Sequence, residues 1–412
     1  MNTVLSSYEL SLRQFNIQSA QNSEKKALSI SGKGGHDMRA AWAEIHLEAI
    51  RKNVQYLRSR IKPSTRMMGV IKADAYGHGV IQTARILEQE GVEQFAVALV
   101  QEGVELRQAG FFQPILLLGH TFEEDYPTVL EYGLMPSIFT MHQAESLNAY
   151  AAKAGKTAFI HIKVDTGMGR LGFLADADDT IDNIAAISRM PNIRIEGIFS
   201  HLATAPQFSD TSYCDMQFAK FMSVLDKLKA AGIEIPIRHI ANSGATILFP
   251  HMQLDMVRPG TAIYGLYAGD ELTQLKDYPI YPAMEIKARL AHVKPVPAGT
   301  RVSYTGSFET KHPSVLGVVP LGYVDGVFRN LANRGSVLVH GQRCPMVGNV
   351  CMDQFVIDIT DVDNPQVGDE VVLIGRQGDE YISAEEVGAL AGTISIEVLC
   401  GLGKRMPMKF VE

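Results

Sequence analysis

Eight short apolar runs recur between residues 67 and 257, and this alternation constrains the fold more than any other feature of the chain. The runs are Met67–Ile71, Phe95–Val100, Pro114–Leu118, Met135–Phe139, Ala158–Val164, Ile193–Phe199, Ile235–Ile240 and Leu254–Val257. Amphipathic stretches separate them, among them Gly103–Gln108, His142–Ala152, Thr180–Ser188 and Met216–Ala231. Near-continuous apolar runs are typical of strands buried on both faces, and strands that alternate with helices form parallel sheets. Eight such units in roughly 220 residues predict an α/β fold of the (β/α)8 barrel type.

The pattern changes after about Tyr281, where β-rich runs follow one another at close spacing with turn signals between them. They are Ala283–Val293, Val315–Tyr323, Ser336–His340, Gln354–Ile359 and Glu370–Ile374, and a helix is expected at Ser383–Leu390. This spacing predicts a second, mainly antiparallel β domain. We therefore expect a barrel domain over 39–280 and a β domain over 281–412, with the first strand, 40–47, joining the β domain.

The first 38 residues differ from the rest, since they are rich in Ser, Gln and Asn and end in Ser31-Gly32-Lys33-Gly34-Gly35. No continuous apolar segment follows a basic start, so a signal peptide is not expected. We interpret residues 1–38 as a flexible N-terminal arm.

Composition excludes several classes of protein. Apolar residues make up 46% of the chain and charged residues 20%, as in soluble globular proteins. The net charge of -7 argues against a nucleic-acid partner, and no apolar run approaches the ~20 residues that span a bilayer. The four cysteines, Cys214, Cys344, Cys351 and Cys400, fit no metal-binding spacing. We expect buried free thiols, no metal site and a cytoplasmic protein.

The first apolar run ends in Lys72-Ala73-Asp74-Ala75-Tyr76-Gly77-His78-Gly79. Catalytic groups of a parallel barrel lie at the carboxyl ends of its strands, so Lys72 points into the barrel mouth. A lone lysine is more often a surface residue, but lysine also attaches pyridoxal phosphate covalently, and the Tyr76 hydroxyl could meet its phosphate. The segment from Lys72 to Gly79 resembles the cofactor-binding signature of the alanine racemases, and the likeness extends from Ala40 to the end of the chain.

The resemblance implies a (β/α)8 barrel with a β domain, and pyridoxal 5'-phosphate on Lys72. It also gives roles to two residues after the fifth run, in Lys163-Val164-Asp165-Thr166-Gly167-Met168-Gly169-Arg170. In the family, the lysine matching Lys163 is carbamylated and orients the arginine matching Arg170, which bonds the phenolic oxygen of the cofactor. A solvated lysine is the alternative for Lys163. The histidine matching His201 lies against the pyridine ring, whereas the residues alone suggest a hydrogen-bonded core histidine.

The last two strands end in small-residue turns, Asn242-Ser243-Gly244 and Pro259-Gly260-Thr261. Ser243 is a good helix N-cap by residue type, and loops after the last barrel strands often bind phosphate. The resemblance places Asn242, Ser243, Gly260 and Thr261 at the cofactor, together with Tyr76.

Arg258 bears most directly on the type of reaction. In the family its counterpart donates to the pyridine nitrogen, and an arginine stays protonated, so it gives that nitrogen no full proton. The ring then withdraws electrons less strongly, which favours return of the proton to Cα over transamination. The alternative is an arginine in a surface salt bridge.

The segment Arg301-Val302-Ser303-Tyr304 matches the family segment with the catalytic tyrosine. Inversion of a stereocentre needs a proton removed from one face and returned on the other. Lys72 would serve one face and Tyr304 the opposite one, and the site must lower their high pKa values. In the family this tyrosine comes from the other subunit of a homodimer, so shared active sites are expected.

Two further segments match stretches of the family at the substrate entrance and at the substrate carboxylate. They are Gly322-Tyr323-Val324-Asp325-Gly326 and Cys351-Met352-Asp353-Gln354, which assign Tyr323, Met352 and Asp353 to the substrate together with Arg170. No histidine motif accompanies Cys351, so we interpret its thiol as structural. Near the C-terminus Ile396 stands where the family has a tyrosine that contacts phosphate, and a side chain without a polar atom there enlarges the pocket.

The sequence therefore predicts an alanine racemase that uses two bases, Lys72 and Tyr304, and that supplies D-alanine for peptidoglycan. A serine or broad-specificity racemase of the same family is the first alternative, because of Ile396. A decarboxylase on the same plan is less favoured, since such enzymes place a glutamate where this chain has Arg258. A non-enzymatic carrier of the cofactor would lack the β domain.

Overall fold

A computed structural model describes residues 39–205, 207, 209–267, 278–403 and 405–412. The N-terminal arm expected over residues 1–38 lies outside this range. Among the described residues, no helix is long and apolar enough to cross a membrane.

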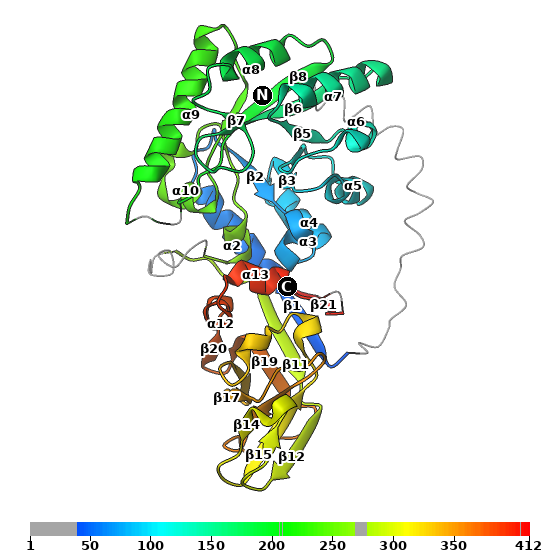
Figure 1. Cartoon of the computed structure of the whole chain (residues 1–412), viewed down its shortest axis with the longest axis vertical. Helices are drawn as coiled ribbons and strands as arrows, with labels where there is room; N and C mark the ends of the chain where they lie inside the picture. Colours follow the sequence, from blue (N-terminus) through cyan, green and yellow to red (C-terminus); the bar gives the residue numbers. More distant parts are fainter. Residues whose placement is uncertain (1–38, 206, 208, 268–277, 404) are drawn as a thin grey trace.

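Parallel strands form a barrel in the upper half of Figure 1. Its strands are β2 (Arg66–Val70), β3 (Gln94–Val97), β4 (Ile115–Leu117), β5 (Met135–Ile138), β6 (Ala158–Asp165), β8 (Ile193–Phe199), β9 (Ile237–His239) and β10 (Met256–Val257). From β2 to β9 each of these strands pairs with the next, and β10 pairs with β2. The amides of Asp255 and Arg258 donate to the carbonyls of Arg238 and Ala241, which links the two ends of the sheet. The short strand β7 (Phe173–Leu174) adds to the edge of β6. The sequence prediction of the barrel is confirmed.

Helices surround these strands and bury apolar faces against them, because one stripe of each helix carries the hydrophobic side chains. They are α2 (Leu47–Ser59), α4 (Val80–Gln89), α5 (Val100–Gln108), α6 (Tyr126–Tyr132), α7 (Met141–Ala154), α8 (Thr180–Ser188), α9 (Ser212–Ala230) and α10 (Ser243–Leu248). The predicted run Phe95–Val100 ends earlier than expected, since β3 stops at Val97. The amides of Ala98 and Leu99 turn away from the sheet to the carboxylate of Glu102.

The second domain is a mainly antiparallel sheet at the opposite end of the molecule (Figure 1). Its strands are β1 (Ala41–His46), β11 (Met284–Arg289), β12 (His292–Val296), β15 (Ser314–Val319), β16 (Ser336–Val339), β17 (Gln342–Val347), β18 (Phe355–Asp358), β19 (Glu370–Gln377), β20 (Glu380–Ile382) and β21 (Met408–Val411), with β13 (Arg301–Val302) and β14 (Phe308–Glu309) as a separate pair. Strand β1 pairs antiparallel with β11 and parallel with β21.

The run predicted as Ala283–Val293 is two strands, not one. The amide of Leu290 donates to the backbone carbonyl of Asp369, beside β19. The amide of Ala291 donates to the backbone carbonyl of Val318 in β15. The chain therefore changes partners between these two residues, a switch that an unbroken apolar pattern does not reveal.

Two helices close the β domain towards the barrel, α12 (Ala384–Ala391) and α13 (Ser395–Cys400). Figure 1 shows α13 beneath α3, the segment Lys72–Gly77. The contact is close, because a Cβ on Gly77 would lie 2.8 Å from the carbonyl oxygen of Leu399. The C-terminal region of the chain thus packs directly behind the segment that carries Lys72.

Candidate active site

The barrel mouth holds a cavity of about 460 Å³. Every barrel residue that the sequence assigned to the cofactor lines this barrel-mouth cavity: Lys72, Tyr76, Lys163, Arg170, His201, Asn242, Ser243, Arg258, Gly260 and Thr261. Lys163 lies near the end of β6 and the others follow strand ends, and the carboxyl ends of parallel strands meet at one rim.

Lys72 begins an uncommon backbone segment. Ala73, Asp74, Ala75 and Tyr76 all have φ between 52° and 55° and ψ between 38° and 53°, so they form a turn of left-handed helix. Such a turn brings Cβ close to the next carbonyl and costs roughly 1–2 kcal/mol per residue. The turn places the Lys72 amine 5.9 Å from the centre of the Tyr76 ring, and both side chains line the cavity.

The surroundings of Lys72 lower the pKa of its amine. Burial is the largest cause, and the positive charge of Arg170 acts in the same direction. Glu102 and Cys400 oppose these effects. A lysine with a lowered pKa has a larger neutral fraction, which is what a general base needs.

Lys163 is buried, with its amine 4.4 Å from the centre of the Phe199 ring. Burial lowers its pKa well below the ordinary value, and the charges of Arg258 and Arg170 lower it further. The alternative of a solvated lysine is wrong. The amine is held where a positive charge is disfavoured.

The loop that carries Arg170 is fixed by Asp165 at the end of β6. Its carboxylate accepts the backbone amides of Gly167, Met168, Gly169 and Arg170 at 2.8–3.2 Å. One side chain thus organises the loop, so that Arg170 reaches the cavity from a defined backbone.

Arg258 is buried, and its hydrogen-bond acceptors are neutral. Its Nη1 lies 2.9 Å from Nδ1 of His239, and its Nη2 lies 2.8 Å from the carbonyl of Ser200 and 3.3 Å from Nδ1 of His201. Burial lowers the pKa of Arg258 to about 9, which leaves the guanidinium protonated at neutral pH. The surface salt-bridge alternative for Arg258 is therefore wrong. Burial, and then Arg258, hold the pKa of His201 well below its ordinary value, so that ring is neutral.

The last two strands supply a cradle of small polar groups. Ser243 Oγ accepts the amides of Gly260 and Ala262 at 2.9 and 3.3 Å. The Thr261 hydroxyl is a buried polar atom with no hydrogen-bond partner among the described residues. A Cβ on Gly260 would lie 2.8 Å from the Tyr76 hydroxyl, so the glycine keeps this space open.

One detail of this cradle differs from the sequence prediction. The N-cap of α10 is Asn242, whose side chain accepts the amide of Ala245 at 3.1 Å. Ser243 is the first helical residue. Because its hydroxyl faces the Gly260 turn, it is not available as the cap.

The predicted β-domain residues gather at a second place. Tyr304, Met352 and Asp353 line a hollow of about 430 Å³ with Ser303, Cys351 and Gln354, here called the β-domain hollow. None of these residues lines the barrel-mouth cavity. Tyr304 is 69% exposed and Met352 is 52% exposed. A single chain therefore presents the two predicted halves of the site separately.

Backbone contacts fix the predicted residues within the β domain. The backbone amides of Tyr323 and Val324 donate to the carbonyls of Cys351 and Met352. These bonds join residues 322–326, predicted at the substrate entrance, to the segment that carries Asp353. The Ser303 hydroxyl donates to the carbonyl of Asn349, and the Asn349 amide donates to the carbonyl of Tyr304 at 2.7 Å. The exposed Tyr304 thus stands on a braced loop.

Sequence reasoning missed the two buried histidines behind Arg258. His239 Nε2 lies 2.8 Å from His161 Nδ1, and both rings are fully buried. They resemble ordinary strand residues in the sequence. The only signal was that His161 and Lys163 share one face of a strand, which places two polar side chains inside the barrel.

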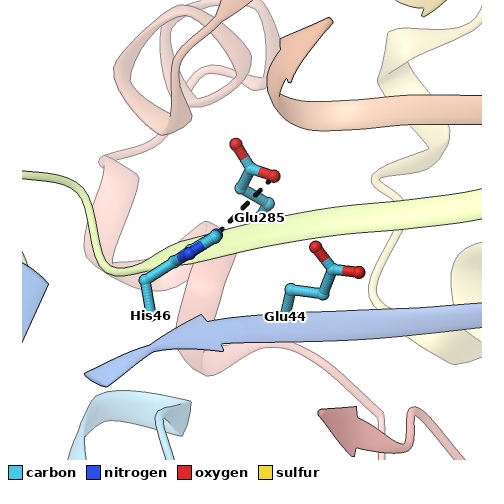
Figure 2. Close-up of side chains that lie close together, drawn as sticks. All are labelled: Glu44, His46 and Glu285. Carbon is cyan, nitrogen blue, oxygen red and sulfur yellow. Dashed lines mark ion pairs between the residues drawn. The ribbon is translucent and has the colours of Figure 1, made fainter. Parts of the chain in front are cut away.

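A third cluster lies between strands β1 and β11. Figure 2 shows Glu44, His46 and Glu285 close together, with His46 facing Glu285. The ammonium of Lys287 lies 2.6 Å from Glu44 and 2.8 Å from Glu285. Because the ammonium of Lys287 contacts both carboxylates, the cluster is an ion-pair network that joins two strands.

A (β/α)8 barrel with a cationic pocket at its mouth, followed by an antiparallel domain that carries an exposed tyrosine, defines a two-domain barrel enzyme. Comparison with known proteins identifies the family. The model of the alanine racemase N-terminal domain matches residues 45–268, and that of the C-terminal domain matches residues 283–410.

Similar proteins agree with this match. An alanine racemase of Methanococcus maripaludis is 44% identical over 371 residues, which cover 90% of this chain and 98% of that protein. The solved alanine racemase of Clostridium difficile has a TM-score of 0.87 at 35% identity and covers 92% of this chain and 97% of its own. The solved alanine racemase from Bartonella henselae, with covalently bound pyridoxal phosphate, has a TM-score of 0.81 at 31% identity, with coverages of 90% and 99%.

The chain belongs to the alanine racemase family and is an enzyme that racemises alanine. The alternative of a serine or broad-specificity racemase is not favoured by these comparisons. Ile396, which suggested that alternative, packs against the core from α13 and is not among the residues lining the barrel-mouth cavity.

Proposed function

We propose that this alanine racemase holds pyridoxal 5'-phosphate in the barrel-mouth cavity, attached to Lys72. Several observations fit the cofactor: the unpartnered Thr261 hydroxyl, the space kept open by Gly260 beside Tyr76, and the cationic lining. Asn242, Ser243, Gly260, Thr261 and Tyr76 would hold the phosphate end. The family includes a member with this cofactor covalently bound.

When bound, pyridoxal phosphate withdraws electrons from the Cα–H bond of the attached amino acid. The chain's own residues then have to move one proton. Lys72 Nζ takes or returns it on one face of Cα, and the Tyr304 hydroxyl does so on the other. The lowered pKa of Lys72 suits this role.

Arg258 and His201 set the electrostatics at the pyridine end. Arg258 donates hydrogen bonds and keeps its own proton, so it supports return of the proton to Cα rather than transamination. His201 is neutral and lies against Arg258, where it would contact the ring. The decarboxylase alternative needs a glutamate at this place and stays disfavoured.

Lys163 is proposed to be carbamylated. Burial, and then the charges of Arg258 and Arg170, lower its pKa and so favour the neutral amine, which adds carbon dioxide to give an N-carboxylate and one proton. The new negative charge would lie between Arg258 and Arg170, the two cations that lower the pKa of the free amine. It would hold the Arg170 guanidinium towards the phenolic oxygen of the cofactor.

A homodimer completes the site. Tyr304, Met352 and Asp353 line their own hollow, and apolar side chains there are exposed, as expected of a surface that a second copy covers. In the proposed dimer the β-domain hollow of one chain faces the barrel-mouth cavity of the other. Tyr304 then reaches Cα, Tyr323 lines the entrance, and Met352 and Asp353 join Arg170 at the substrate carboxylate.

All four cysteines are free thiols, and Cys214 and Cys344 are buried. Free thiols are typical of a reducing compartment, which supports the proposal of a cytoplasmic enzyme that makes D-alanine for peptidoglycan. Deletion of the gene should then create a requirement for D-alanine, where no second racemase is present.

The observation that carries the proposed function is the convergence of every predicted cofactor residue on one cavity around Lys72. Borohydride reduction of the purified holoenzyme, followed by peptide mapping, should locate the cofactor on Lys72. Lys72→Ala should abolish racemisation of L- and D-alanine, measured by chiral chromatography. A cofactor label on another lysine would refute the assignment.

A further inference from the structure

The left-handed turn that carries Lys72 is held from outside by one carboxylate. Glu102 lies on α5, and its Oε1 accepts the backbone amide of Ala73 at 2.6 Å. Its Oε2 accepts the amides of Ala98 and Leu99 at 2.7 and 3.0 Å. The two oxygens of Glu102 therefore join the start of α5 to the residue that follows Lys72.

The contact falls where the strained backbone begins. Ala73 is the first residue with positive φ, and a left-handed turn of non-glycine residues persists only where its surroundings fix it. Within the turn, the Ala75 amide bonds to the carbonyl of Ile71. The carboxylate of Asp74 accepts the amide of Val80, which follows the turn, at 2.7 Å. Among the described residues, the group that accepts the Ala73 amide is the carboxylate of Glu102.

From these contacts we propose that Glu102 is a positioning residue for Lys72, which fixes the left-handed turn and so sets the direction and charge of the lysine amine. This inference rests on the proposed role of Lys72. A glutamine cannot replace Glu102, because its amide has one acceptor oxygen and would turn donor hydrogens towards donor amides.

Several charged or titratable groups face Lys72. They are Glu102 from α5, Arg170 from the loop after β6, Cys400 from α13, His201 after β8, and Tyr76 within the turn. Glu102 is the carboxylate of this set and favours the protonated amine. Removing its charge should therefore lower the pKa of Lys72.

The matched control is Glu105, one turn further along α5. Burial raises the pKa of Glu105, and the nearby charges of Asp74 and Glu102 raise it further. Glu105 is therefore near the same groups, but the Ala73 amide donates to Glu102 and not to Glu105. Glu105→Gln removes the same charge from the same helix. It separates the contact to the turn from a general loss of negative charge.

The test uses the holoenzyme with Glu102→Gln, Glu102→Asp and Glu105→Gln. For Glu102→Gln, kcat should fall roughly 10- to 100-fold with KM nearly unchanged, since a small misplacement of a reacting group has this effect. The acid limb of the pH profile of kcat should move to lower pH. Glu102→Asp keeps the charge, but its side chain is too short to reach the Ala73 amide. Its kcat should therefore fall, while the acid limb of the pH profile stays at the wild-type pH. Glu105→Gln should resemble the wild type.

A measurement on the wild type keeps the test valid if Glu102→Gln does not fold. Hydrogen exchange of the Ala73 amide should be slow for an exposed residue, because Glu102 accepts its hydrogen bond. Rapid hydrogen exchange of the Ala73 amide would overturn the proposal. The proposal would also be overturned if Glu102→Gln and Glu105→Gln had the same kcat and the same acid limb in the pH profile of kcat. Cofactor trapped on another lysine would instead refute the proposed function.

Discussion

Nη1 of Arg258 lies 2.9 Å from Nδ1 of His239, and both side chains are buried. Arginine can only donate, so Nδ1 of His239 is the acceptor and its Nε2 carries the proton. That proton points to Nδ1 of His161, 2.8 Å away, which leaves the His161 proton on Nε2. Two neutral histidines with fixed tautomers thus orient the guanidinium.

The first prediction concerns the reaction that Arg258 selects. Arg258→Glu should let the pyridine nitrogen take a proton, so that transamination increases relative to racemisation. Pyruvate formed per alanine racemised is the measurement. Arg258→Lys keeps a positive charge and should stay close to the wild-type ratio, although its single ammonium replaces a fork of donors. Equal ratios in Arg258→Glu and the wild type would remove Arg258 from this role.

The second prediction concerns Tyr304, which stands on the loop braced by Asn349. Tyr304→Phe removes only the hydroxyl, so the cofactor should stay bound while kcat falls roughly 100-fold or more, the range for loss of an acid–base group. Visible absorbance and chiral chromatography report the two quantities. Tyr281→Phe, at another exposed tyrosine, should be silent. Near-normal rates in Tyr304→Phe would contradict the two-base scheme.

The third prediction tests the shared site. Lys72→Ala and Tyr304→Phe are each expected to be inactive, yet a mixed dimer has one site with both residues intact. Random exchange between equal amounts should restore about a quarter of the wild-type activity, as twofold symmetry requires. Subunit exchange is verified with two affinity tags. Mixed dimers without activity would show that each chain uses its own Tyr304.

The sequence was sufficient for the barrel because each strand is a nearly continuous apolar run, and parallel strands bring their carboxyl ends together. The positions of Lys72, Lys163 and Arg258 at one cavity follow from that rule. The left-handed turn could not be predicted, since no glycine stands between Ala73 and Tyr76 to signal positive φ. The division at residue 280 and the dimer stay predictions.

The buried histidines were missed for a related reason. A histidine inside an apolar strand has no local signature, and its partner comes from a distant strand. His161 and His239 are 78 positions apart in the sequence, and only the closed barrel brings their rings into contact. Their role behind Arg258 is therefore a property of the fold rather than of a motif.

The last prediction concerns acid stability and His78. This ring is fully buried, and its Nδ1 lies 2.9 Å from the carbonyl of Tyr76. Burial lowers its pKa from 6.5 to about 4. Above pH 6.5 neither state binds the proton, so His78 has no effect there. As pH falls through 6.5 the unfolded chain takes up a proton that the folded chain refuses, and stability is lost until the pH reaches about 4.

This single group should make the free energy of unfolding about 2 kcal/mol smaller at pH 5 than at pH 8. His161, with a pKa lowered to about 3, adds a loss of the same sign. In His78→Asn the amide keeps a donor for the Tyr76 carbonyl but does not titrate, so the variant should lose less stability between pH 8 and pH 5 than the wild type. Urea unfolding of the holoenzyme, followed through the fluorescence of Trp42, measures the difference. Parallel pH dependences for the two proteins would mean that the pKa of His78 is the same in the folded and unfolded states.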